Sequence, residues 1–292
     1  MFGSDNKQKK VSFFAKDDTE CPLCKTKHNK EELLSGGGRL IAGKLTGELR
    51  RLYQESKKYG LIYPLAYNIQ VCPRCLYAAF PKDFNRLKDN EIGALKQTTD
   101  HRVKLVSTLF TNVNFKEPRT LVHGAASMVL AVDCYHLRDV YVAPTIKKAV
   151  TSIRAAWLLS DLHQFASYRP YDKAADFYYM ESVRNYHKTL ELMQTGKEPV
   201  EAESYILGPD LDKNWGYDGV IYLNALLTKK YLDRMAASKP EQKDLLERSK
   251  RYLSKLYGSG KSSRSKPSAI VDMAKDLYDE LGDMIEAMEK EV

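Results

Sequence analysis

Two Cys-Pro-x-Cys pairs hold four of the five cysteines and are the part of this chain best suited to chemistry. Cys21 and Cys24 form the first pair, and Cys72 and Cys75 form the second. In a Cys-x-x-Cys turn both sulfur atoms face one point, and two such turns complete a tetrahedral shell of four thiolates. A shell closed in this way has no open position for a substrate, which is typical of structural zinc. The sequence therefore predicts a structural Zn²⁺ ion bound by Cys21, Cys24, Cys72 and Cys75.

Other uses of these cysteines are weaker interpretations. A redox-active Cys-x-x-Cys usually occurs once, near a βαβ pattern, whereas this chain has two pairs and no such unit. An iron–sulfur cluster also takes four cysteines, and the sequence leaves that alternative open. His28 follows Cys24 by four residues, but with four thiols available we interpret it as a surface residue. Cys134 ends an apolar stretch, where a free cysteine is most often a packing residue.

The motifs of common enzymes are incomplete in this sequence. Residues 38–44 match the first seven positions of a phosphate-binding loop, but Leu45 stands where a hydroxyl must hold magnesium. The histidines form no His-Glu-x-x-His pair, and no Gly-x-Ser-x-Gly elbow is present. We therefore expect a protein that is not an enzyme.

The N-terminal part of the chain must position both cysteine pairs. Residues 1–18 are polar and lysine-rich, and we predict a flexible leader there. Residues 19–85 form the predicted zinc-binding module, whose folding the metal would support. Residues 67–71 alternate apolar and polar side chains, which predicts a half-buried strand leading into the second pair.

Apolar residues at spacings of three and four predict a helical domain over residues 86–292. Pro144 stands at a helix start and Gly196 at a helix end. Residues 258–267 have the composition of a flexible loop. Trp215 lies outside the periodic pattern, and we interpret it as packing its loop onto the helices. The expected helices cover approximately residues 103–113, 121–132, 144–157, 172–195, 220–231, 240–256 and 270–288.

Successive helices with one apolar face are typical of a bundle or of a stacked array, and tetratricopeptide repeats are the nearest named type. A clean repeated frame of tryptophan, glycine, alanine and proline is missing. The predicted fold class is therefore mainly α, with a small N-terminal zinc-bound module containing a short β element, packed on a tetratricopeptide-like helical array.

The segments around the cysteines resemble those of a bacterial family of uncharacterised proteins, the DUF2225 family. The resemblance rests on Cys21-Pro-Leu-Cys24, on Pro64-Leu-Ala-Tyr67 and on the segment Val71–Phe80, which reads Val-Cys-Pro-Arg-Cys-Leu-Tyr-Ala-Ala-Phe. Members of that family carry two such pairs followed by a tetratricopeptide-like helical region. The resemblance covers most of the chain and implies a bacterial cytoplasmic protein that combines zinc with helices. It implies no activity.

Composition and charge narrow the possible environments and partners. The longest apolar runs, such as Met128–Val132, are far shorter than the roughly 20 residues of a membrane-spanning helix. The first residues lack the apolar core of a secretory signal, so we expect a cytoplasmic protein. The formal net charge of +8 favours acidic partners or nucleic acid without identifying either.

Two functions fit these features. We expect an adaptor or scaffold that binds a protein partner, because stacked helices form concave surfaces suited to peptides and helices. The alternative is binding of RNA or single-stranded DNA through basic and aromatic residues near the cysteines. We favour another interpretation for residues 45–53, an amphipathic helix with Leu45, Leu49 and Leu52 toward the core and its arginines toward water. The residues of the basic and aromatic cluster are Arg39, Lys44, Arg50, Arg51, Lys57, Lys58, Tyr53 and Tyr59.

Overall fold

The computed structural model describes residues 10–212, 215–257 and 268–290, and the chain divides into two compact units. Unit 1 comprises Met1–Thr46, Arg50–Arg138 and Arg154–Ala175. Unit 2 comprises Gly47–Leu49, Asp139–Ile153 and Asp176–Val292. The sequence analysis expects a domain boundary between residues 85 and 86, and that boundary stays a prediction. The two compact units are divided at other positions of the chain.

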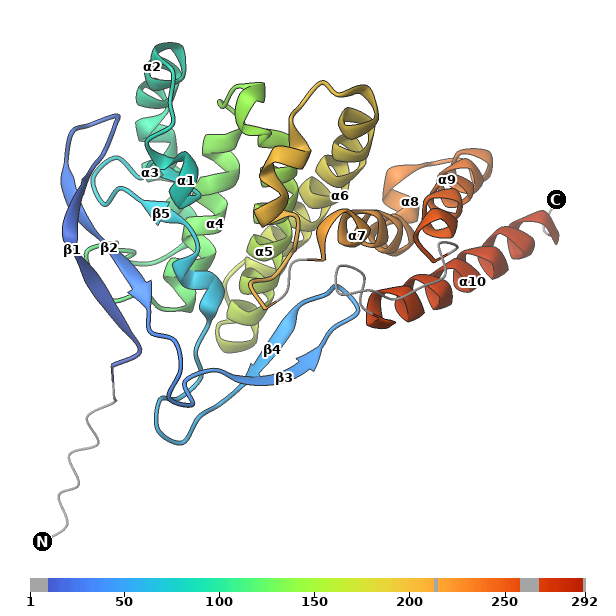
Figure 1. Ribbon diagram of the computed structural model, residues 1–292, viewed down its shortest axis with the longest axis horizontal. Helices are drawn as coiled ribbons and strands as arrows, with labels where there is room; N and C mark the ends of the chain where they lie inside the picture. The colour runs from blue at the N-terminus through green and yellow to red at the C-terminus, as the bar shows by residue number, and fades with distance from the viewer. Residues whose placement is uncertain (1–9, 213–214, 258–267, 291–292) are drawn as a thin grey trace, which may run out of the picture. The chain divides into compact units, whose positions relative to one another are not determined.

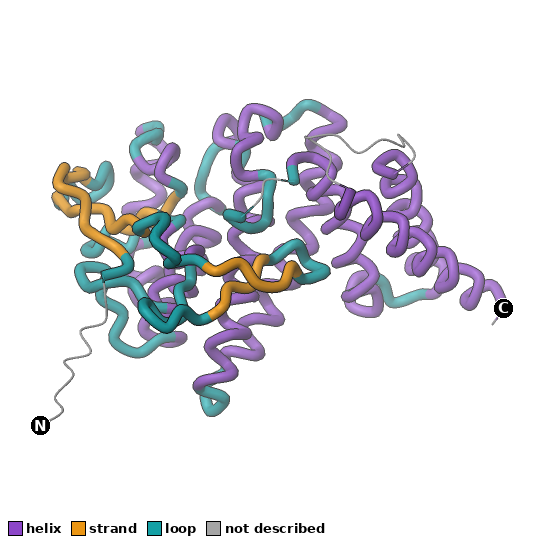
Figure 2. Tube along the Cα trace, turned by 60° about the horizontal axis from the view of Figure 1, so that its bottom comes forward, coloured by secondary structure: helices purple, strands orange, loops and turns teal. Residues whose placement is uncertain are grey.

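Three antiparallel hairpins form the β structure of unit 1 (Figure 2). The first and third hairpins carry the cysteines, because residues 21–26 connect the strands of the first and residues 72–77 connect those of the third. The paired strands are β1 (Ser12–Glu20) with β2 (Lys27–Leu33), β3 (Ile41–Leu45) with β4 (Arg51–Gln54), and β5 (Gln70–Val71) with β6 (Ala78–Ala79).

The prediction of a flexible leader over residues 1–18 is wrong for residues 12–18. These residues belong to β1, which pairs with β2 in a register that sets Ser12 opposite Leu33 and Phe14 opposite Glu31. The Ser12 hydroxyl donates to the buried carboxylate of Glu31, so this polar strand is held by ladder and side-chain hydrogen bonds. Residues 1–9 lie outside the described residues.

The amphipathic helix expected over residues 45–53 is also wrong. The chain reverses direction there, with the Thr46 amide donating to the Arg50 carbonyl over 2.8 Å, and continues into β4. Leu49 is buried as expected, but its φ of +61° is incompatible with a right-handed helix. Leu52 is 39% exposed because the period of a strand, not of a helix, decides its direction.

The strand expected over residues 67–71 is shorter than its alternating pattern suggests. Tyr67 is the last residue of a 3₁₀ helix, η1 (Pro64–Tyr67), which begins at a proline whose fixed φ suits a first helical position. Only Gln70 and Val71 form β5. The local turn chemistry of Pro64 overrides the alternation.

Four helices lie wholly within unit 1 beside the hairpins. The longest, α4, packs against β6 and η1, and most of its residues are buried. A Cβ atom at Gly124 of α4 would lie 3.0 Å from the Cα and Cβ atoms of Ala66 in η1, so this close contact favours glycine. The four helices are α1 (Pro81–Phe84), α2 (Asp89–Gln97), α3 (Thr99–Leu109) and α4 (Leu121–Tyr135).

Helices also make up unit 2, to which α5 and α6 contribute part of their length. Helix α9 packs against α7 and α10, and α7 also contacts α10 (Figure 1). The predicted helix start at Pro144 and the stop at Gly196, whose φ is +64°, are confirmed. The elements are η2 (Val140–Val142), α5 (Pro144–Phe165), α6 (Tyr171–Thr195), η3 (Val200–Ile206), α7 (Gly216–Lys230), α8 (Leu232–Met235), α9 (Lys239–Tyr257) and α10 (Ser268–Lys290).

The fold is mainly helical with a small N-terminal β region, in agreement with the predicted class. Trp215 is buried, as its interpretation as a packing residue required. The flexible loop predicted for residues 258–267 lies outside the described residues. Within the part of the chain that the structure describes, no helix combines the length and the apolar character needed to cross a membrane.

Candidate metal centre

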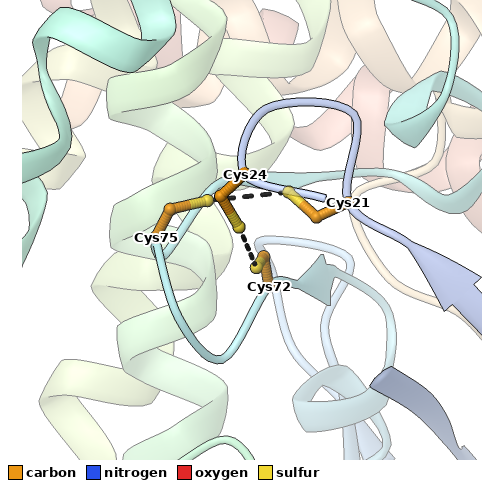
Figure 3. A group of neighbouring side chains, drawn as sticks. All are labelled: Cys21, Cys24, Cys72 and Cys75. Atoms are coloured by element: carbon orange, nitrogen blue, oxygen red, sulfur yellow. Dashed lines mark hydrogen bonds between the residues drawn. The ribbon is translucent and has the colours of Figure 1, made fainter. Parts of the chain in front are cut away.

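The first cysteine turn is closed by two backbone hydrogen bonds. The Cys21 amide donates to the Thr26 carbonyl, and the Lys25 amide donates back to the Cys21 carbonyl, both over 3.0 Å. Lys25 has a φ of +61°, the left-handed conformation, which turns the chain back after Cys24. Both sulfur atoms of this turn, which connects β1 to β2, therefore point toward the other two cysteines (Figure 3).

The second turn repeats this geometry at the end of β5. The Cys72 amide donates to the Tyr77 carbonyl over 2.9 Å, and the Leu76 amide donates to the Cys72 carbonyl over 3.0 Å. Leu76, like Lys25, follows the second cysteine of its pair and has a positive φ, here +55°. The two Cys-Pro-x-Cys sequences therefore form two equivalent turns.

The four sulfur atoms converge on one point (Figure 3). All four lie within 4.8 Å of one another, and the sulfur of Cys21 lies 3.6 Å from that of Cys75 and the sulfur of Cys24 3.5 Å from that of Cys72. Metal–sulfur bonds of about 2.3 Å set the sulfur atoms of a tetrahedral site about 3.8 Å apart, whereas a disulfide requires about 2.05 Å. The four free thiols are thus arranged to hold one metal ion.

The thiols and backbone amides around Cys72 favour negative charge on its sulfur. Hydrogen bonds from the thiols of Cys21 and Cys75, followed by the amides of Cys75 and Arg74, hold the pKa of Cys72 well below its usual range. The hydrogen bond between Cys21 and Cys72 raises the pKa of the Cys21 thiol to about 12. A metal cation bound here would take the place of such protons and would hold all four groups as thiolates.

A buried arginine holds the second turn from behind. Arg102 of α3 donates from Nε to the Cys75 carbonyl over 3.2 Å and from Nη2 to the Leu95 carbonyl over 2.8 Å. Its Nη1 donates to the Thr98 hydroxyl over 2.7 Å. Sequence reasoning did not identify Arg102, although it lies four residues before Val106 and so shares that residue's buried helix face.

Cys134 is a buried packing residue near the second turn, as the sequence predicted, and it does not belong to the group of four thiols. The Ala78 amide of β6 donates to its sulfur over 3.4 Å, and burial raises the pKa of this thiol to about 12. The neighbouring Tyr135 hydroxyl accepts the Phe80 amide over 3.0 Å. These contacts join the strand after the second turn to α4.

Histidines do not extend the thiol group. His28, interpreted from sequence as a surface residue, is half-buried with its ring packed edge-on against Phe84 at 5.7 Å. His123 lies 3.0 Å from the Thr120 hydroxyl at the start of α4. Within the described ranges, Cys21, Cys24, Cys72 and Cys75 are the one group of three or more Cys, His, Asp or Glu ligands arranged for a metal.

Two arginines of the basic cluster are engaged inside unit 1. Arg50 forms a two-pronged ion pair with Asp161, one hydrogen bond of which measures 3.0 Å, and stacks on the Trp157 ring at 5.6 Å. Arg51 donates to the Gly43 carbonyl over 2.8 Å. Both guanidinium groups therefore already donate hydrogen bonds to other residues of unit 1.

Comparison with known proteins places the chain in a family. Residues 14–281 match the model of a family described as "Uncharacterized protein conserved in bacteria (DUF2225)". The chain is 42% identical over 272 residues to an uncharacterized protein of Borreliella burgdorferi, an alignment that covers 92% of this chain and 96% of that protein. No solved structure matches the chain. A family match over nearly the whole length, together with this identity, shows that the chain belongs to the DUF2225 family.

Proposed function

We propose that this protein is a non-enzymatic, zinc-stabilised helical adaptor that binds a protein partner in the bacterial cytoplasm. The proposal has two parts, the identity and role of the metal and the nature of the partner. Each part rests on different residues and has its own test.

Zinc is the proposed metal because all four donors are thiols. Thiolate ligands in tetrahedral geometry favour zinc or an iron–sulfur cluster over oxygen-seeking cations such as magnesium. Cys21, Cys72 and Cys75 are buried, which supports a structural rather than a catalytic role. Elemental analysis of the purified protein should give one zinc per chain. Iron and sulfide with visible absorption would instead establish a cluster.

Binding of a protein partner is supported by two aromatic side chains at the end of α5 and just after it. Phe165 is 71% exposed and Tyr168 is 85% exposed, and both belong to unit 1. Large aromatic groups that stay in water are common at contact surfaces, where burial of each contributes a large apolar area. This exposure is the single observation that carries the adaptor proposal.

The test is affinity capture with crosslinking from the native cells. The wild-type protein should retain one dominant protein at moderate and at high salt, and the double variant F165S/Y168S should lose it. The control F177S changes an aromatic residue of unit 2 that is also exposed and should retain the partner. Equal capture by all three proteins would refute a role for Phe165 and Tyr168.

Nucleic-acid binding is the weaker alternative because of how the basic cluster is used. Arg50 and Arg51 are bound to Asp161 and Gly43, and Arg39 lies over the Tyr59 ring at 4.8 Å. Contacts to phosphates would have to compete with these interactions. Nucleic acid retained at low salt and lost steeply as salt rises would support this alternative.

A further inference from the structure

Unit 1 contains a cavity of about 520 Å³ beneath the first hairpin. Its walls are the start of β1, the segment 59–67 and the residues that lead into α4. The side chains of Phe14 and Leu61 line it and are partly exposed, so apolar surface borders its opening. A volume of this size holds a small organic molecule or the last residues of a peptide.

One cationic group in this cavity has unused donors. Nη1 of Arg119 donates to the carbonyls of Ala66 over 2.7 Å and Ile69 over 2.8 Å. Its Nε and Nη2 atoms donate to no group of the described residues and are not shut off from solvent. Burial is the main cause that lowers the pKa of Arg119, to about 10, so the group stays charged near neutral pH and would gain from an anion. A guanidinium edge with two free donors fits a carboxylate in a bidentate manner.

The remaining charges of the cavity leave it net positive. Lys10 lies on its wall, and Thr120 is the N-cap of α4, whose helix dipole favours negative charge. One carboxylate opposes them, that of Glu31. It already accepts the Ser12 hydroxyl and, over 2.9 Å, the Arg119 backbone amide. Its charge also raises the pKa of the Arg119 guanidinium, but by less than burial lowers it.

The strand that forms one wall can also accept an extended chain. The Leu34 amide donates to the Val11 carbonyl, so the alternation of an antiparallel pair directs the backbone groups of Ser12 and Phe14 to the opposite edge of β1. In the described part of the chain β1 pairs with β2 alone. A free strand edge beside an apolar cavity is the arrangement by which peptides are bound as an added strand.

We propose that this cavity binds the C-terminal carboxylate of a partner protein, with the partner's last, apolar side chain between Phe14 and Leu61. Arg119 binds the carboxylate, and the edge of β1 holds the preceding residues. The inference rests on the proposed adaptor function and specifies the part of the partner that is recognised.

The test uses the full-length, metal-loaded protein and labelled hexapeptide pools, randomised at the first five positions and ending in Leu or Phe. Fluorescence anisotropy should show binding of the free acids, with at least tenfold weaker binding of the C-terminal amides. Equal binding of acids and amides, or binding of neither pool, would overturn the proposal. A fatty acid is the other ligand class that would bring a carboxylate and an apolar chain to this cavity, and dodecanoate is its probe. Binding of dodecanoate without binding of the free-acid peptides would also overturn the proposal.

Variants locate the binding to the cavity. L61D places a negative charge on the cavity wall at a residue that is 43% exposed. It should weaken the binding of the free-acid peptides at least tenfold without unfolding the protein. L52D is the matched control on β4, outside the cavity, and should bind like the wild type. Equal affinities of the two variants would contradict the assigned site. If the partner is still captured while the peptides fail to bind, the adaptor proposal stands and this inference fails.

Discussion

The turn that carries Cys21 and the turn that carries Cys72 repeat the same pair of backbone hydrogen bonds, but their surroundings differ. The first turn closes the β1–β2 hairpin, and its left-handed residue, Lys25, is exposed. The second turn lies in the core of unit 1, where Arg102 binds the Cys75 carbonyl and α4 packs against the strand that follows. Both turns thus close a hairpin, and the second is also held by a buried arginine and followed by a strand that packs on a long helix.

These different surroundings indicate what a metal bound by both turns would contribute. A core held by a buried arginine and by α4 has its own contacts, whereas a two-stranded hairpin is marginal in water without further support. A metal bound by both turns would therefore add to the contacts that already hold the hairpin on the core, such as His28 against Phe84 and the Arg119 amide on Glu31. It would also steady the β1 wall of the proposed peptide cavity.

The largest effect is expected from the cysteines themselves. Cys72→Ser removes a ligand from the core turn, and we expect loss of zinc and unfolding of the cysteine-bearing hairpins, since metal binding supplies about 10 kcal/mol in small zinc modules. Cys21→Ser should also lose zinc, but with less damage, because the turn of Cys72 keeps all its residues and its contacts with Arg102 and α4. Hydrogen exchange should then show β1 and β2 exchanging fast while β5 and β6 stay protected. A soluble, cooperatively folded, zinc-free C72S protein would refute the structural role.

The second largest effect is expected at Arg102. Arg102→Met leaves the Cys75 carbonyl without its side-chain donor and leaves the Leu95 carbonyl with the Thr98 hydroxyl alone as side-chain donor, and we expect a loss of about 3 kcal/mol in the free energy of unfolding. The control Arg74→Met changes an exposed side chain of the second turn and should shift stability by less than about 0.5 kcal/mol. Urea unfolding monitored by circular dichroism measures both. Equal stabilities would show that the second turn is not held by Arg102.

Metal affinity should rise with pH. Because hydrogen bonding to Cys72 raises the pKa of the metal-free Cys21 thiol to about 12, this group carries a proton at pH 7 that must leave when metal binds. Acidification therefore favours release, and affinity increases from pH 6 to pH 8. Competition with a chelator at fixed free zinc gives the affinities, and calorimetry in two buffers counts the protons. An affinity independent of pH would contradict protonated thiols in the metal-free protein.

The smallest effect compares the two left-handed residues directly. Lys25→Gly removes the steric cost of a positive φ at an exposed position and should stabilise the protein by about 0.5 kcal/mol. Leu76→Gly removes the same cost but also loses a half-buried side chain, so its net effect should be zero or destabilising. Thermal unfolding with zinc present measures the difference. Equal gains at both positions would indicate that the two turns are supported alike.

Local patterns were sufficient for several features of this protein. The ligand spacing in the two cysteine pairs identified the four thiols, and helical periodicity with Pro144 and Gly196 identified the long helices. These succeed because a turn or a helix is determined by neighbouring residues. The same reasoning failed at residues 45–53, where three leucines have helical spacing but Leu49 adopts a left-handed conformation inside a turn.

Cysteine spacing and helical periodicity were enough to predict the four candidate metal ligands and a mainly helical chain. Only the packed fold shows that residues 12–18 form a strand, that Arg102 holds the second cysteine turn and that Arg119 lines a cavity. Each of these depends on partners far away in the sequence: Leu33 and Glu31 for the strand, the Cys75 carbonyl for Arg102, and Ala66 and Ile69 for Arg119. A hydrogen bond or ion pair between distant segments leaves no periodic trace in the chain, because its geometry exists only after the segments have packed.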